Sequence, residues 1–122
     1  MHEVGLVEGI LETVRQRAGD RPVARVRVRI GTLHRASQGP MEQAFEMVGA
    51  GTNLEDAQLE LIQMPVRSTC SSCSSIEESA DRVAVCAACG GVALTHEGGD
   101  ELILESIEYR PAAAMPTAST DG

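Results

Sequence analysis

The 122 residues are 43% hydrophobic but include only Phe45 and Tyr109 as aromatics, which allows one modest domain with an aliphatic core, or one domain carrying a small inserted lobe. The formal net charge is -8 and every basic side chain is an arginine, because the sequence contains no lysine. The acidic balance disfavours nucleic acid as the main partner, and the missing lysine excludes a P-loop, so any nucleotide hydrolysis must be done by another protein.

The first predicted element is a helix, because apolar residues between Val4 and Ala18 recur at helical spacing. Gly5 and Gly9 each weaken it by ~1 kcal/mol relative to Ala, and their one-turn spacing would permit a neighbouring element to come close. The segment lacks the basic start and unbroken apolar core of a secretory signal, and no run approaches transmembrane length. We therefore expect a cytosolic, cytoplasmic protein with no membrane partner.

A strand is predicted from Val23 to Ile30, where apolar residues alternate with Arg25, Arg27 and Arg29. This period of two is typical of a strand with one packed face and one wet face. We interpret the arginines as the wet face, and the same row is a candidate for docking an acidic partner or for shielding a sheet edge.

The remaining regular elements follow the same logic. Residues 31–39 are expected to form a loop, and Pro40 suits the first turn of a second helix that Gly49 ends. Residues 57–64 and 102–109 are rich in Leu and Ile and are predicted to be strands. The pattern indicates an α+β (α/β) fold, in which a small three-stranded sheet packs with two helices.

Residues 68–99 differ in character, because they are rich in Ser, Ala, Gly and Cys. We interpret them as a lobe inserted into the α/β domain, which then comprises residues 1–67 and 100–110. Residues 111–122 show no periodicity and are expected to form a disordered tail.

The inserted lobe contains two CxxC pairs, which consist of Cys70, Cys73, Cys86 and Cys89. A two-residue spacer lets a tight turn place both sulfurs on one cation, and two such turns supply four thiolates in tetrahedral geometry. The spacing predicts a zinc ribbon with a structural Zn(II). Two disulfides are the alternative, which a cytosolic location disfavours. Iron is a second alternative, but an iron centre usually has an apolar shell in place of the Ser and Ala neighbours found here.

A zinc ribbon alone does not specify function, and a nucleic-acid- or protein-binding regulatory ribbon is the alternative function. Near the sulfurs, Arg67 and Arg82 are outnumbered by three acidic residues, and no aromatic residue is available for base stacking. Four thiolates on one zinc add about two further negative charges. These features disfavour nucleic-acid binding.

The first three residues, Met1-His2-Glu3, offer a metal site of another kind. With the initiator methionine retained beside the bulky His2, the amine of Met1, the backbone nitrogen of His2 and the His2 ring can close two chelate rings around one cation. Nitrogen donors in a near-planar arrangement suit Ni(II) or Cu(II) more than Zn(II). A second-position histidine is usually incidental, however, and Glu3 in a first helical turn favours the helix dipole by ~0.3–1 kcal/mol whether or not it binds metal.

Several segments resemble, in order, the HypA/HybF family. They are MHEVGLVEGILE, VRVRIGTL, AFEMVGAGT, AQLELIQMP, the two CxxC pairs and LILESIEY. The resemblance runs from Met1 to about Tyr109, and its most specific part is the MHE start combined with the paired CxxC ribbon. Proteins of that family insert nickel during maturation of nickel–iron hydrogenase.

The resemblance implies a nickel metallochaperone that is not an enzyme. Ni(II), the cargo, would bind through His2, with Met1 and Glu3 contributing by amine and backbone atoms, while the four cysteines hold Zn(II). The implied partners are a GTPase nickel-insertion accessory protein, the apo-hydrogenase large subunit and, in some bacteria, urease maturation proteins. The residues agree with a binding protein, because spacing singles out no nucleophile–base pair and no nucleotide motif.

Two other histidines are weighed against this scheme. His34 lies in a polar loop and is expected to be solvated. His96, just beyond the ribbon, is a candidate additional nickel ligand in a transfer complex. The sequence departs from the family at Thr32, where an acidic residue is frequent, and in the loop of residues 33–39; we assign Thr32 no ligand role.

Overall fold

The computed structural model describes residues 2–111, which form two helices, a short 3-10 helix and six strands. In chain order these are α1 (His2–Ala18), β1 (Val23–Gly31), η1 (Thr32–His34), α2 (Gln38–Gly49), β2 (Gln58–Met64), β3 (Val66–Cys70), β4 (Ile76–Ser79), β5 (Leu94–Glu97) and β6 (Leu102–Tyr109). They make up two compact units. The second unit contains Arg29–Ala36 and Leu61–Ile103, and the first contains the other described residues.

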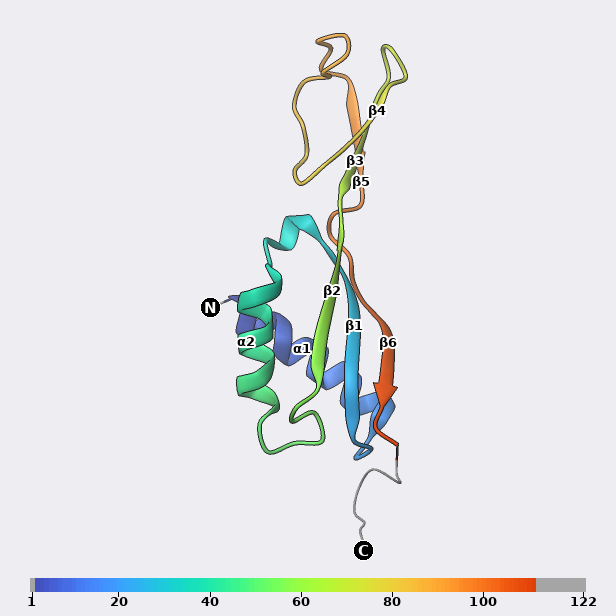
Figure 1. Cartoon of the computed structure of the whole chain (residues 1–122). Helices are drawn as coiled ribbons and strands as arrows, with labels where there is room; N and C mark the ends of the chain where they lie inside the picture. The colour runs from blue at the N-terminus through green and yellow to red at the C-terminus, as the bar shows by residue number, and fades with distance from the viewer. Residues whose placement is uncertain (1, 112–122) are drawn as a thin grey trace, which may run out of the picture. The chain divides into compact units, whose positions relative to one another are not determined.

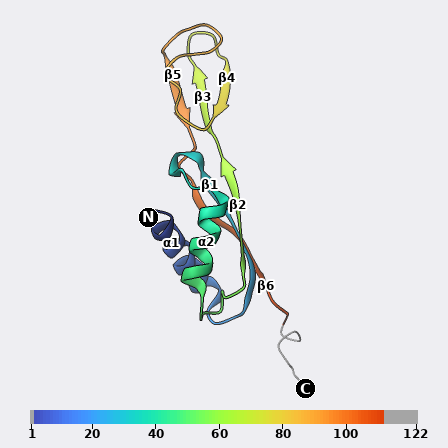
Figure 2. The same ribbon diagram turned by 60° about the vertical axis from the view of Figure 1, so that its left-hand side comes forward.

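In the first unit, helices α1 and α2 pack against each other on one side of the strands (Figures 1 and 2). Apart from Phe45, the buried side chains of the two helices are aliphatic: Val7, Ile10, Leu11, Val14 and Ala18 from α1, and Met41 and Ala44 from α2. These positions recur at helical spacing, so each helix buries one stripe and leaves its polar face in water. The core is the aliphatic one that the composition predicts.

Strand β1 is the central strand of a sheet with the order β2-β1-β6. Val26 and Val28 are buried, whereas Arg25 and Arg27 alternate with them and lie on the opposite face of the strand. The predicted alternation is therefore confirmed. Because β1 has a neighbour on each side, its arginines do not shield a sheet edge.

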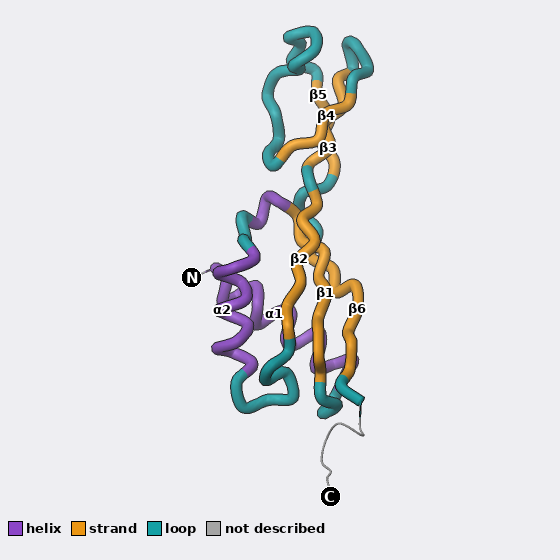
Figure 3. Tube along the Cα trace, viewed as in Figure 1, coloured by secondary structure: helices purple, strands orange, loops and turns teal. Residues whose placement is uncertain are grey.

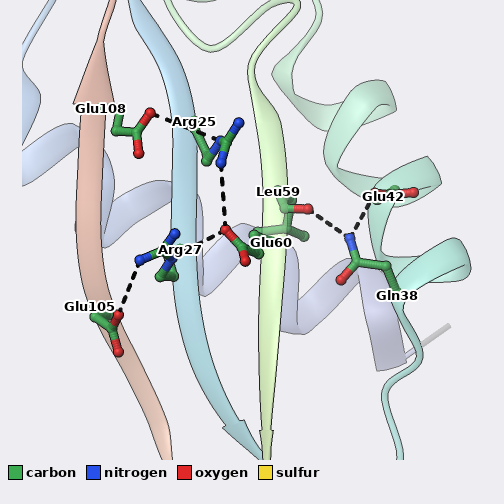
Figure 4. Close-up of polar contacts among 8 residues, drawn as sticks. All are labelled: Arg25, Arg27, Gln38, Glu42, Leu59, Glu60, Glu105 and Glu108. Carbon is green, nitrogen blue, oxygen red and sulfur yellow. Dashed lines mark hydrogen bonds and ion pairs between the residues drawn. The ribbon is translucent and has the colours of Figure 1, made fainter.

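Glutamates from both flanking strands pair with the β1 arginines (Figure 4). Arg27 donates from Nε to Glu60 Oε1 at 3.1 Å, and its Nη1 lies 3.7 Å from Glu105 Oε2. Arg25 lies 3.8 Å from Glu60 and 3.9 Å from Glu108. The hydrogen bond to Glu60 is the main reason why the pKa of Arg27 is raised. Two members of the predicted docking row are thus already paired within the sheet.

Helix α2 begins at Gln38, so Pro40 lies in its first turn, as predicted. The Gln38 amide donates to Glu42 and to the backbone carbonyl of Leu59, at 2.7 Å in each case (Figure 4). Leu59 belongs to β2, an edge strand of its sheet. The side chain therefore occupies one backbone acceptor on an edge strand.

In the second unit, the end of β1 and the short helix η1 lie against residues 99–101. Gly31 N–H donates to the carbonyl of Glu101, and Leu33 N–H donates to that of Gly99, both at 2.8 Å. A Cβ on Gly31 would overlap the carbonyl group of Gly99, so glycine is required for this close approach. The expected loop of residues 31–39 is replaced in part by η1 and by the start of α2.

The rest of the second unit contains a small sheet with the order β4-β3-β5, in which β3 pairs antiparallel with both neighbours. Ser68 on β3 lies opposite Glu77 on β4 and His96 on β5. Between β4 and β5 the chain runs as loops and turns (Figure 3). Burial alternates along β3 and β4 but not along β5. Each strand has only four or five residues of mostly small or polar type, so the sequence did not predict them.

The predicted α+β fold, with two helices, a three-stranded sheet and a four-cysteine lobe, is confirmed. Gly5 and Gly9 are exceptions to the expected packing, because nothing lies within 4 Å of the Cβ position at either. Neither helix of the described chain has the length and apolar composition needed to cross a membrane. The expected tail, residues 111–122, falls outside the described residues except for Pro111.

Candidate metal centre

The sulfurs of Cys70, Cys73, Cys86 and Cys89 all lie within 4.8 Å of one another. Cys70 Sγ lies 3.7 Å from Cys89 Sγ, and Cys73 Sγ lies 3.6 Å from Cys86 Sγ. These separations are far longer than the ~2.05 Å of a disulfide bond, and all four cysteines are free. In a tetrahedral site with metal–sulfur bonds of ~2.3 Å, neighbouring sulfurs lie ~3.8 Å apart. The cluster therefore fits one tetrahedral cation and does not fit two disulfides.

The first CxxC turn is closed by two backbone hydrogen bonds. Ser74 N–H donates to the carbonyl of Cys70 at 2.9 Å, and Cys70 N–H donates to the carbonyl of Ser75 at 3.0 Å. Cys70 also ends β3, so the central strand of the small sheet leads directly into the turn. The sheet thereby fixes the direction from which the first sulfur enters the centre.

The second CxxC turn repeats this pattern. Gly90 N–H donates to the carbonyl of Cys86 at 2.8 Å, and Cys86 N–H donates to the carbonyl of Gly91 at 2.8 Å. The residue after each pair has a positive φ, which is 76° at Gly90 and 65° at Ser74. Glycine adopts this left-handed conformation without a Cβ clash, and serine does not. Glycine at residue 90 therefore suits the turn, and Ser74 holds the same position under strain.

Hydrogen bonds favour the thiolate form at two of the sulfurs. The pKa of Cys86 is lowered to about 6, first by the Ser75 hydroxyl and then by the backbone N–H groups of Cys89 and Ala88. The pKa of Cys73 is also lowered, first by the Ser75 hydroxyl and then by the Ser75 backbone N–H. Both sulfurs are thus prepared to carry negative charge.

The pKa of Cys89 is instead raised to about 12. The backbone N–H of Gly91 favours its thiolate, but the neighbouring sulfurs of Cys73, Cys70 and Cys86 together oppose a further negative charge. Four adjacent sulfurs therefore cannot all ionise unless a cation compensates them. The centre has the chemistry of a cation site.

Burial divides the cysteines by their place in each pair. Cys70 and Cys86, the first members, are 1% and 4% exposed, whereas Cys73 and Cys89 are exposed. Ser75, which sequence reasoning did not single out, lies beside one sulfur of each pair, since its Oγ is 3.2 Å from Cys73 Sγ and 3.3 Å from Cys86 Sγ. Four serines near the first pair look alike in the sequence, so no signal distinguishes Ser75 from the others.

The two described histidine side chains make hydrogen bonds away from the cysteines. His34 Nε2 donates to the backbone carbonyl of Asp100 at 3.0 Å. The sequence predicted only a solvated ring, whereas the fold also holds it by this hydrogen bond. His96 Nδ1 lies 2.9 Å from Oγ of Ser68, which is only 1% exposed. Among the described residues, the metal-ligating cluster consists of the four cysteines alone.

Two residues of the expected nickel site, His2 and Glu3, lie at the start of α1. Met1 is outside the described residues, and His2 is described only as the first residue of the helix. Glu3 lies in the first turn, where its carboxylate favours the helix dipole.

Residues 1–109 match a protein family described as hydrogenase/urease nickel incorporation, metallochaperone, HypA. Hydrogenase maturation factor HypA of Paracoccus denitrificans is 37% identical over 111 residues, which are 88% of this chain and 98% of that protein. The factor of the same name from Rhodobacter capsulatus is 34% identical over 111 residues, with the same coverage.

Among solved structures, the solution structure of the nickel metallochaperone HypA from Helicobacter pylori is similar in fold. The TM-score is 0.54 at 23% sequence identity, and the match covers 88% of this chain and 96% of that one. The sequence match from residue 1 to residue 109 includes both the MHE segment and the four-cysteine lobe.

Proposed function

This chain belongs to the HypA family of hydrogenase and urease nickel-incorporation metallochaperones, and we propose from this premise that it binds Ni(II) at its first residues and delivers it to the apo large subunit of nickel–iron hydrogenase. The observation that carries the proposal is the family match over residues 1–109. That match spans Met1-His2-Glu3 as well as the cysteine lobe. In this role the protein is a carrier and not an enzyme, and nickel is its cargo.

The proposed nickel ligands are the Met1 amine, the His2 backbone nitrogen and the His2 ring, with Glu3 contributing backbone atoms. Nitrogen donors in a near-planar arrangement favour Ni(II) over Zn(II). A site with few ligands at the start of a chain also suits delivery, because the cargo must leave. His96 is proposed as an additional ligand during transfer; since its Nδ1 is paired with Ser68, the nitrogen it would offer is Nε2.

Zn(II) is the proposed occupant of the four-cysteine centre, where it would be a structural ion. Four sulfurs fill every position of a tetrahedral zinc and leave none for water or substrate. The surrounding residues are mostly serines and alanines, and two of the cysteines are exposed, whereas iron centres favour an apolar shell. Residues 68–99 would then form a zinc-ribbon domain, inserted between residues 1–67 and 100–110 of a nickel-binding domain.

The proposed partners are the recipient large subunit, a GTPase accessory protein and, in some bacteria, urease maturation proteins, all in the cytoplasm. The GTPase is needed because this chain contains no lysine and hence no P-loop. Nucleic acid is not proposed as a partner. Near the cysteine lobe, Arg67 pairs with Glu78 at 3.5 Å and Arg35 pairs with Asp81 at 2.5 Å, so carboxylates already neutralise these two guanidinium groups.

The nickel site is tested by calorimetric titration with Ni(II) of four proteins that carry no affinity tag. They are the native chain, a chain extended at its start by a few residues that do not bind metal, His2→Ala, and His34→Ala as the matched control. We expect the extension and His2→Ala to abolish high-affinity binding, because the extension converts the Met1 amine into an amide and His2→Ala removes the imidazole ring. His34→Ala should leave nickel binding intact. Equal affinity for all four proteins would refute the proposed site.

The zinc site is tested by the metal content of purified protein. The native chain is expected to hold one zinc, and Cys73→Ala is expected to bind zinc more weakly and to be purified with much less of it, because one of the four thiolates is gone. An unchanged zinc content in Cys73→Ala would contradict the four-thiolate site.

The alternative function is tested separately, because tight, salt-resistant binding of the native chain to nucleic acid would favour the regulatory ribbon.

A further inference from the structure

The Ser75 hydroxyl lies between two sulfurs that belong to different CxxC pairs. Its Oγ is 3.2 Å from Cys73 Sγ and 3.3 Å from Cys86 Sγ, and those two sulfurs are 3.6 Å apart. Both distances are within the range of hydrogen bonds to sulfur. The three atoms therefore form a compact triangle that joins the first turn to the second.

Once the sulfurs are thiolates, a hydroxyl in this position acts as a hydrogen-bond donor to them. Metal-bound thiolates accept hydrogen bonds and cannot donate them, so the single Ser75 proton is shared between the two sulfurs in a three-centre hydrogen bond. Hydrogen bonds to charged acceptors are stronger than those between neutral groups. Groups of this kind around a metal orient the ligands and adjust their charge.

The corresponding position in the second turn has no such donor. There, residue 91 is a glycine whose N–H points to Cys89 Sγ at 3.4 Å. A Cβ at Gly91 would lie 3.2 Å from the same sulfur, which is tighter than ordinary van der Waals contact. Backbone N–H groups can serve a sulfur within their own turn, whereas the Ser75 side chain reaches across to Cys86.

We propose that Ser75 is a positioning residue of the metal centre, whose hydroxyl donates to the thiolates of Cys73 and Cys86, ties the two CxxC turns together and slows the release of zinc. The inference rests on the proposed zinc site and adds a residue to it. Ser75 touches the ligands and not the metal, so it acts through their orientation and charge.

The test compares zinc affinity and zinc release to a chelating indicator in three variants of the full-length protein. Ser75→Ala removes the hydroxyl and is expected to lower zinc affinity by about tenfold or more, the usual effect of losing a partner of a metal ligand. Ser75→Thr keeps a hydroxyl and is expected to stay near the native value. Ser72→Ala is the matched control, because within the described residues the Ser72 hydroxyl makes no hydrogen bond.

A spectroscopic readout separates a direct effect on the sulfurs from a general loosening of the lobe. In cobalt-substituted protein, Ser75→Ala is expected to move the sulfur-to-cobalt charge-transfer absorption to longer wavelength, because thiolates without a hydrogen bond are stronger electron donors. Ser72→Ala is expected to leave it in place.

Ser75→Ala with native affinity and an unmoved absorption would overturn the inference while leaving the zinc site itself intact. An equal loss of affinity in Ser72→Ala and Ser75→Ala would also overturn it, since the effect would then not depend on the hydroxyl between the sulfurs. A native protein without stoichiometric zinc would overturn both the zinc site and the role of Ser75.

Discussion

Ser74 and Gly90 occupy the same backbone position in the two CxxC turns, but only the glycine is suited to it. Both have a positive φ, and an L-residue with a Cβ pays roughly 1–2 kcal/mol in that region. The N–H of each residue closes its turn by donating to the carbonyl of the first cysteine. The second turn is therefore the more relaxed of the two.

Substitutions at these two positions are expected to change stability in opposite directions. Gly90→Ala should lower the free energy of unfolding by about 1 kcal/mol, because nothing lies within 4 Å of its Cβ position and the penalty comes from the backbone alone. Ser74→Gly should raise it by up to ~1 kcal/mol, since relief of strain exceeds the added chain entropy. Thermal unfolding of the zinc-loaded variants measures both, and a more stable Gly90→Ala would contradict the argument.

Among elements, those with a clear period could be predicted from the sequence. Strand β6 has the predicted ends, α1 ends at Ala18 as predicted, and β1 extends one residue beyond the predicted Ile30. In each case the burial of one face follows from the side chains alone. The cysteine cluster was also predictable, because the CxxC spacing itself encodes the turn.

Other elements depend on contacts between residues far apart in the chain and could not be predicted. The 3-10 helix η1 is held by a backbone hydrogen bond from Leu33, and the residue before it by one from Gly31, both to residues 99–101. Strands β3, β4 and β5 are too short and too polar to show a hydrophobic period in the sequence, and their pairing depends on one another. Likewise, Ser75 acquires its role only when the second cysteine pair is placed beside it.

Two glycine-to-alanine substitutions test whether a glycine is required by a long-range contact or only by its local element. Gly31→Ala should lower the free energy of unfolding by ~3 kcal/mol or prevent folding, because its Cβ would overlap the Gly99 carbonyl. Gly9→Ala, on an exposed face of α1 with open space around it, should instead raise it by ~1 kcal/mol. Chemical denaturation reports both changes, and a Gly31→Ala protein of native stability would show that β1 and residues 99–101 are not in close contact.

At the scale of the whole molecule, the two units differ in what holds them together. The first has an extensive aliphatic core from α1, β1 and α2. Apart from glycines, the buried set of the second is short: Ile30, Ala36, Val66, Ser68, Cys70 and Cys86. Two of those six residues are candidate metal ligands. With so little apolar burial, we expect this unit to gain much of its stability from a metal bound by the four cysteines.

Metal removal should therefore affect the units unequally. After zinc is chelated, amides of β3, β4 and β5 are expected to lose hydrogen-exchange protection, while those of α1 and α2 keep it. Exchange followed by mass spectrometry at peptide resolution makes the comparison. Uniform loss of protection across the chain would mean that the metal supports the whole fold.

The two proposed sites should also respond to acid at different pH. Nickel binding requires a neutral amine and imidazole, so its affinity should fall as pH drops through ~6.5, the unperturbed histidine value. At the zinc site, the lowered pKa of Cys86 reduces proton competition for that thiolate, and four sulfurs hold one ion where the nickel site offers three nitrogens. Native mass spectrometry across a pH series should show nickel lost before zinc; the reverse order would contradict the two assignments.

Strand β2 lies at a border of its sheet, and such borders can recruit a strand from another copy of the chain. The Gln38 amide of helix α2 already donates to the carbonyl of Leu59 on that strand, so this backbone acceptor is not available to a strand from another copy. Gln38→Ala would leave the Leu59 carbonyl free to accept a hydrogen bond from a strand of another copy of the chain. We therefore expect light scattering to detect self-association of Gln38→Ala at a lower protein concentration than that of the native chain.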